Sequence, residues 1–144
     1  MSAQARPEAQ APATVRSFTR RLSPSPRGAR LARLLVVRQL NAWGYGDDEP
    51  SRTAAAAIVA ELAANAVTHG RVPGRGFEVG LVLTGSMLRI EVADTRAERR
   101  PAVAAPGPDS ETGRGLLLVS ALATRWGVAE RRGPGKTVWA EIDC

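Results

Sequence analysis

The chain has 144 residues, 44% of them hydrophobic, which suits one globular domain with a core of its own. No stretch is long and apolar enough to span a bilayer, and the first residues lack the apolar core of a signal peptide. The single cysteine, Cys144, excludes an internal disulfide, so we expect a cytoplasmic protein. Twenty Lys and Arg against 14 Asp and Glu give a charge of +6, which leaves nucleotides, nucleic acids and acidic proteins open as partners.

The first half of the chain predicts a tail, a short strand and two helices. Residues 1–13 are rich in Ala, Gln and Pro without periodicity, so we expect a disordered tail before a domain over 14–144. Residues 14–22 predict an edge strand, and Ser25-Pro26 is a helix-start signal. The first helix is predicted to run to Trp43, with arginines opposite an apolar face of Leu31, Leu34, Leu35, Leu40 and Trp43. The second begins with the acidic residues 47–49 and ends at Gly70.

The second half of the chain predicts mainly strands. Alternating apolar residues and turn signals predict strands over residues 77–84, 88–94, 126–132 and 137–142. Residues 95–112 have no period and form a connection of the length typical of lids and binding loops. After it, Gly113-Arg114-Gly115 is predicted to open a helix over 116–123. This order predicts an α+β fold, a two-layer sandwich with helices on one face of a mixed, mainly antiparallel sheet.

Three polar residues interrupt the apolar second helix at intervals of four: Glu61, Asn65 and His69. On a helix this spacing places them on one face. Burying a carboxylate and an amide without partners is costly. The stripe must therefore face water, a metal with its ligand, or another segment of the chain. His69, near the helix end, is most simply a capping or dipole-compensating residue, and we do not expect it to be catalytic.

Two further features have ordinary explanations when taken alone. Asp94, at the end of a predicted strand, is of a residue type that commonly forms turns. Gly113 and Gly115 can simply make a tight turn before a helix. They are not a dinucleotide fingerprint, because no parallel strand–turn–helix unit surrounds them.

In their order along the chain, these pieces resemble the ATP-binding domain of the GHKL (Bergerat-fold) superfamily. The segment from Glu61 to Gly70 looks like its N-box, and the residues ending at Asp94 look like the start of its first glycine box. The second glycine box resembles residues 113–119, and the closing strand resembles residues 135–139. The resemblance covers roughly residues 15–142. It is greatest to stand-alone proteins similar to bacterial anti-sigma-factor serine/threonine kinases.

The resemblance implies ATP and Mg²⁺ as ligands and assigns them residues. Asn65 would hold Mg²⁺, since a hard cation takes oxygen ligands beside waters and phosphate oxygens. Glu61 would be the general base that activates a hydroxyl or water. Asp94 would accept a hydrogen bond from the adenine amino group, and Thr137 would support the same base directly or through water.

The second glycine box would hold the phosphates. Gly113 and Gly115 would let backbone N–H groups approach them at a helix N-terminus, next to Leu116. Arg114 could reach a phosphate oxygen or remain solvated. The chain departs from the family at the first glycine box, because Thr95 and Arg96 follow Asp94 where glycine is usual.

The function implied is an anti-sigma-type kinase that phosphorylates an antagonist (anti-anti-sigma) protein and sequesters a sigma factor, as a homodimer. Phosphoryl transfer depends mostly on positioning and electrostatics, so a domain of this size suffices. A second hypothesis is a nucleotide-binding module that acts through protein contacts only, which the altered glycine box favours. A nucleic-acid binder ranks last, because the arginines are scattered along the sequence and no recognition motif accompanies them.

Overall fold

The structure is a computed structural model that describes residues 15–69, 76–94, 111–130 and 135–144. The predicted tail, most of the long loop and the turn before the last strand lie outside these residues. The described elements are β2 (Val15–Leu22), α2 (Pro26–Ala42), α3 (Pro50–His69), β3 (Phe77–Thr84), β4 (Met87–Asp94), α4 (Glu111–Leu122), β5 (Arg125–Glu130) and β6 (Lys136–Asp143).

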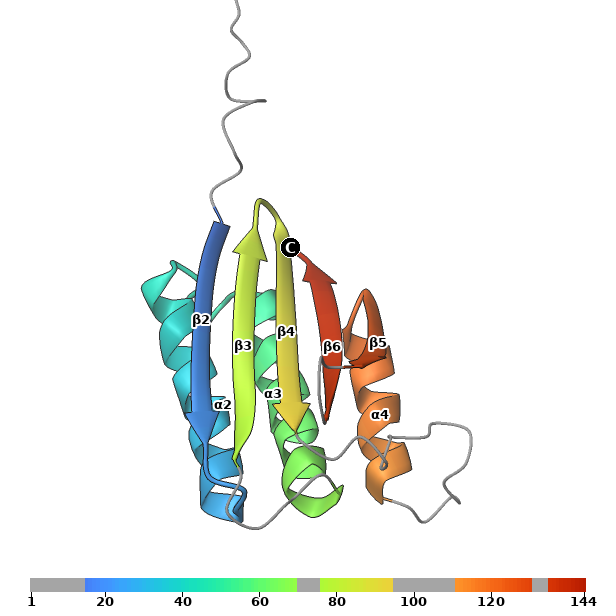
Figure 1. Cartoon of the computed structure of the whole chain (residues 1–144). Helices are drawn as coiled ribbons and strands as arrows, with labels where there is room; N and C mark the ends of the chain where they lie inside the picture. Colours follow the sequence, from blue (N-terminus) through green and yellow to red (C-terminus); the bar gives the residue numbers. More distant parts are fainter. Residues whose placement is uncertain (1–14, 70–75, 95–110, 131–134) are drawn as a thin grey trace, which may run out of the picture.

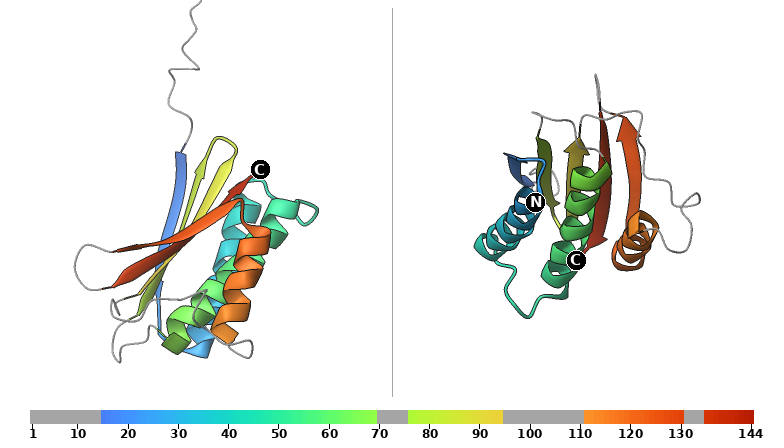
Figure 2. Two further views of the ribbon diagram at one scale, coloured as in Figure 1. Left: turned by 90° about the vertical axis from the view of Figure 1, so that its right-hand side faces the viewer. Right: turned by 90° about the horizontal axis from the view of Figure 1, so that it is seen from below.

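The strands form one sheet in the order β2-β3-β4-β6-β5. Every pairing in the described residues is antiparallel. The three helices lie side by side behind the sheet in Figure 1, and the side view in Figure 2 shows that they cover one face only. The predicted two-layer α+β class is therefore confirmed. None of these helices is long and apolar enough to cross a membrane.

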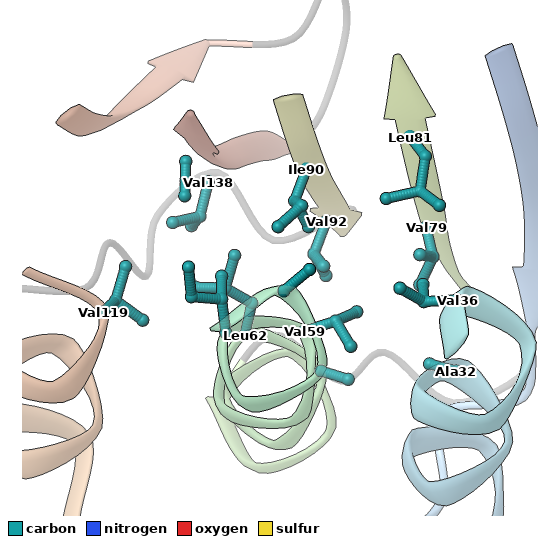
Figure 3. Close-up of a cluster of buried hydrophobic side chains, with 14 of the residues drawn as sticks. Ala32, Val36, Val59, Leu62, Val79, Leu81, Ile90, Val92, Val119 and Val138 are labelled. Carbon is teal, nitrogen blue, oxygen red and sulfur yellow. The ribbon is translucent and has the colours of Figure 1, made fainter. Parts of the chain in front are cut away.

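The core lies between the helices and the inner face of the sheet. Strand residues alternate between the two faces, so every second side chain of β3, β4 and β6 is buried. Figure 3 shows Val59 and Leu62 of α3 lying beneath Ile90 and Val92 of β4. A fully buried aliphatic side chain of this kind contributes about 1.5–3 kcal/mol relative to an exposed one. The apolar half of α3 thereby fixes how its polar stripe is oriented.

Helix α2 is rotated from the orientation that its leucines predict. Its buried residues are Gly28, Ala32, Val36 and Leu40, whereas Leu31 and Leu34 are 39% and 50% exposed. The buried row repeats every four residues and begins with small residues that allow close approach. A Cβ added at Gly28 would lie 2.0 Å from a backbone carbonyl oxygen. The predicted burial of Leu31 and Leu34 was wrong, but the start signal is confirmed, since Ser25 accepts a hydrogen bond from the Gly28 amide.

Two helix starts also differ from the predictions. Helix α3 begins at Pro50, so the three acidic residues precede it and do not lie in its first turn. Helix α4 begins at Glu111, so Gly113 and Gly115 lie within the helix and do not form a turn before it. The two glycines still belong to the N-terminal end of α4.

The outer face of the sheet carries a network of charged side chains instead of a helix layer. Glu141 on β6 accepts hydrogen bonds from Arg125 and Arg89 at 2.7 Å each. Arg89 also lies over the Trp139 ring, 4.5 Å from its centroid. The hydrogen bonds from Arg125 and Arg89 hold the pKa of the Glu141 carboxyl below its usual range. This network ties β4, β5 and β6 together on the solvent side.

We expect the melting temperature of Glu141→Gln to change less with falling pH than that of the parent protein. A carboxyl with a depressed pKa in the folded state stabilises it fully above the ordinary glutamate pKa, and this contribution is lost as the pH falls below about 4. The parent should therefore melt at a higher temperature than the variant at neutral pH, and the difference should close in acid. Thermal melts of both proteins from pH 7 to 3 measure this. A difference that stays constant over this range would exclude the ionised Glu141 as its source.

Candidate functional site

Four separate stretches of the sequence converge at one end of the molecule. Strand β4 ends there, β6 begins there, α3 ends there, and α4 begins there (Figure 1). These are the stretches that carry the residues predicted to bind nucleotide. The antiparallel pairing of β4 with β6 and the packing of α3 against α4 are the contacts that bring them together.

Glu61 and Asn65 form the described part of the polar stripe on α3. Both are partly exposed, one turn apart, on the flank of α3 away from the residues that contact α2. Helix α4 packs beside that flank. Glu61 makes no ion pair or hydrogen bond within the part of the chain that the structure describes. The side chain of His69 lies outside it.

The side-chain amide of Asn65 has a buried Nδ2 atom without a hydrogen-bond partner. No other side-chain nitrogen or oxygen in the described residues is buried and unsatisfied in this way. Leaving such a group unpaired costs about 1–3 kcal/mol, so its presence calls for an explanation. The nitrogen and oxygen of an amide differ little in shape, and a rotation exchanges them. Asn65 can therefore present an oxygen to a ligand that fills this position.

Asp94 and Lys136 form a buried ion pair at the end of the sheet. They lie directly opposite each other in the β4–β6 register, with Lys136 Nζ 2.9 Å from Asp94 Oδ2. The two residues are only 5% and 4% exposed. Both side chains continue the inward-facing rows of their strands, so they lie between the sheet and the helices. A carboxylate at this position can accept a hydrogen bond from an adenine amino group, as predicted.

Thr137, which was predicted to support the adenine base, is placed differently. It alternates with Lys136 along β6 and pairs with Ala93, so its side chain belongs to the outer face. The structure thus brings Lys136, and not Thr137, against Asp94. Sequence reasoning gave Lys136 no role, although it is the only lysine in the chain. A single lysine at the start of a strand with alternating apolar residues was the available signal.

The residues that resemble the second glycine box lie at the N-terminal end of α4. The first four backbone N–H groups of a helix have no partner within it, and the helix dipole favours an anion there. Residues 111–114 occupy these positions in α4, and Gly113 is among them. The side chain of Arg114 lies outside the described residues. Leu116 is fully buried in the core beside Val119, so it holds the helix in place by packing.

These residues fit ATP with Mg²⁺ better than a metal held by protein alone. The described residues contain no group of three His, Cys, Asp or Glu side chains that could hold a metal ion. Mg²⁺ usually keeps several waters and binds phosphates together with one or two protein ligands. A single amide oxygen from Asn65 beside phosphates at the α4 N-terminus matches that pattern. The unsatisfied amide of Asn65 is the structural observation that favours a ligand there.

The fold and the placement of these residues agree with an α+β ATP-binding domain. Residues 22–142 match the family described as the histidine kinase-like ATPase domain. Because this match spans most of the chain, the protein belongs to that family, which implies ATP binding. No curated protein matches the sequence.

Solved structures share the fold at low sequence identity. One comprises the RsbU and RsbW domains of Rv1364c from Mycobacterium tuberculosis, with a TM-score of 0.67 and 17% identity. The similarity covers 89% of this chain and 32% of that one, so this chain spans about a third of that protein. Another is the SiaB–SiaC complex from Pseudomonas aeruginosa, with a TM-score of 0.59, 12% identity, and coverage of 87% and 88%. At these identities the likeness shows the fold.

Proposed function

We propose that this protein binds ATP with Mg²⁺ between α3 and the end of β4–β6, and transfers the γ-phosphoryl group to a serine or threonine of an antagonist protein. The observation that carries the proposal is the pair Glu61 and Asn65, one turn apart on the α4 flank of α3. Glu61 has no partner within the described residues, and Asn65 has a buried, unsatisfied amide atom. A carboxylate and an amide without protein partners are groups that a bound ligand can engage.

In this proposal each residue has one task. Glu61 accepts the proton of the attacking hydroxyl, whose oxygen forms a bond to the γ-phosphorus as the bond between that phosphorus and the β–γ bridging oxygen breaks. Asn65 contributes an oxygen to the metal, and the N-terminal amides of α4 donate to phosphate oxygens. Asp94 accepts from the adenine amino group. ATP supplies the transferred group, and Mg²⁺ neutralises charge on the phosphates.

The alternative is a nucleotide-binding module that acts only through protein contacts. The residues after Asp94, where the chain departs from the family's glycine box, favour it. Incubation of the parent protein with radiolabelled ATP, Mg²⁺ and the antagonist encoded nearby separates the two hypotheses. A kinase labels the antagonist, and the label is lost when the acceptor serine or threonine is replaced by alanine. Saturable ATP binding without any labelling would establish the binding module instead.

Asp94→Asn is expected to weaken ATP binding about tenfold to a hundredfold, because an amide can present a donor where the adenine amino group needs an acceptor. The structure adds a second effect. The substitution removes the charge opposite the buried Lys136, so the variant should also lose about 3–5 kcal/mol of stability. Titration calorimetry well below the melting temperature separates the two effects. An unchanged ATP affinity in the folded variant would return Asp94 to a purely structural role.

The position of the arginines supports an acidic protein as the partner. Residues 15–46 contain seven arginines and no acidic residue. They fold into β2 and α2, which lie side by side at one edge of the molecule (Figure 1). None of the seven forms an ion pair with an acidic side chain in the described residues. These seven arginines therefore lie along one edge, whereas others, such as Arg52, Arg89 and Arg125, lie elsewhere on the molecule.

A groove between α2 and α3 adds an apolar surface to this edge. It has a volume of about 340 Å³ and is lined by Pro26, Ala29, Arg30, Arg33, Ala60, Ala64, Val67 and Thr68. Nucleic acids would engage the arginines but offer little for an apolar groove. A protein segment with apolar anchors and acidic flanks fits both the arginines and the groove. We propose that the antagonist or the sigma factor docks here, with the chain acting as a cytoplasmic homodimer as its family resemblance implies.

Replacing Arg33 should weaken partner binding, whereas replacing Arg38 should not. Both arginines are exposed on α2, but only Arg33 lines the groove. Arg33→Ala is expected to weaken binding of the antagonist or sigma factor roughly threefold to tenfold, with a larger effect at low salt. Arg38→Ala is the matched control for loss of one charge. Equal effects of the two variants in surface plasmon resonance would mean that overall charge, and not the groove, attracts the partner.

A further inference from the structure

Stability alone does not explain why Asp94 and Lys136 form a buried ion pair. Lysine and aspartate are rarely buried this completely unless they are paired, and both ions lose their hydration. Well-packed apolar residues would often stabilise the same position at least as well. The pair is also not needed to set the strand register, because the alternation of apolar and polar residues on β4 and β6 already does so. A role beyond packing is therefore the simpler explanation for the only lysine in the chain.

The chemistry of the two groups is complementary. A carboxylate only accepts hydrogen bonds and an ammonium only donates them. Lys136 Nζ lies 2.9 Å from Asp94 Oδ2, so the inner face of the sheet presents an acceptor and a donor side by side. An ammonium carries three donors and a carboxylate about four acceptor sites, so each group can take part in several hydrogen bonds at once.

The edge of adenine has the matching pattern. Its amino group is a donor, and the neighbouring ring nitrogen N1 is an acceptor. A carboxylate alone can serve only the amino group, and its negative charge faces the lone pair of N1. A buried acceptor without a donor costs free energy, so a second group is needed for tight binding.

We propose that Lys136 is the second base-reading residue, donating a hydrogen bond to N1 while Asp94 accepts one from the amino group. This inference rests on the proposed ATP site and names the residue that completes its selectivity for the base. It gives to Lys136 the supporting role that the sequence assigned to its neighbour, Thr137, whose side chain belongs to the opposite face of the sheet.

The test compares three nucleotides with the parent protein by titration calorimetry. In 1-deaza-ATP a CH group replaces N1, and in 7-deaza-ATP a CH group replaces N7, which is remote from the edge that Asp94 and Lys136 would read. We expect 1-deaza-ATP to bind about tenfold to a hundredfold more weakly than ATP, as loss of a hydrogen bond to a charged donor predicts. We expect 7-deaza-ATP to bind about as well as ATP. Equal affinity for ATP and 1-deaza-ATP overturns the inference while leaving the ATP site intact.

Two variants then identify the donor. In Lys136→Met the ratio of the ATP and 1-deaza-ATP affinities should fall to nearly one. In the control Thr137→Val it should remain as in the parent. Where a thermal melt shows that Lys136→Met is unfolded, Lys136→Gln replaces it, and its ratio should be clearly below that of the parent. A ratio that falls in Thr137→Val but not in the Lys136 variants contradicts the inference.

Two other outcomes are equally informative. Tighter ATP binding by Lys136→Met would show that the lysine competes with adenine for Asp94, and would also contradict the inference. A folded parent that binds none of the three nucleotides would overturn the proposed ATP site itself. The failure of the inference and the failure of the proposed function are thus distinguishable.

Discussion

Glu61→Ala is expected to leave ATP binding within about twofold of the parent and to lower phosphate transfer by about 10²–10⁴-fold, the usual effect of losing a positioned general base. The separation follows from the stripe on α3. In the proposed site Glu61 lies one turn from Asn65 and would act on the attacking hydroxyl, whereas Asn65 would hold the metal and Asp94 would hold the adenine. Transfer of label from ATP to the antagonist, measured together with ATP affinity by calorimetry, gives both quantities for parent and variant.

Glu78→Ala is the matched control for this experiment. Glu78 is a partly exposed glutamate on the outer face of β3, remote from the helices. A purely structural Glu61 would show a lower melting temperature and normal transfer. The absence of any described partner for Glu61 argues against that result. Unchanged transfer in Glu61→Ala, with a normal rate in Glu78→Ala, would remove Glu61 from the chemistry.

Asn65→Ala is expected to abolish the Mg²⁺-dependent part of ATP binding without destabilising the fold. The buried Nδ2 atom of Asn65 has no hydrogen-bond partner in the described residues, so its removal breaks no bond there. Alanine is also the better helix former. We therefore expect a melting temperature equal to or above that of the parent, together with an ATP affinity that no longer responds to Mg²⁺.

The control is Gln39→Ala, which removes a partly exposed amide from α2. It should bind ATP with Mg²⁺ as the parent does. An Asn65 that is only a core residue would give the reverse pattern, with a lower melting temperature and unchanged ATP binding. That result would make the metal assignment wrong.

The fold could be predicted closely because the local signals agree with one another. Alternating residues define β3 and β4, Gly85-Ser86 joins them, and Ser25 with Pro26 starts α2. The orientation of α2 was harder to predict, since leucines are a poor guide when a helix approaches the sheet through Gly28 and Ala32. The close contact at Gly28 depends on the backbone of Ser23, which no periodicity reveals.

The site could be predicted only in part. The spacing of Glu61 and Asn65 places them on one face from the sequence alone, and the structure confirms that both are partly exposed on the same flank. The partnership of Asp94 with Lys136 depends on the β4–β6 register across 42 residues, and a shift of one residue would have brought Thr137 inward instead. The placement of seven arginines along one edge likewise depends on the packing of β2 beside α2.

The most direct test of the central claim is calorimetry of the parent protein with ATP, in the presence and absence of Mg²⁺. The arrangement of Asn65, Asp94 and the α4 N-terminus predicts saturable binding of one ATP per chain, which weakens when Mg²⁺ is withheld. A protein that melts cooperatively, and is therefore folded, yet takes up no ATP with Mg²⁺ would contradict the account.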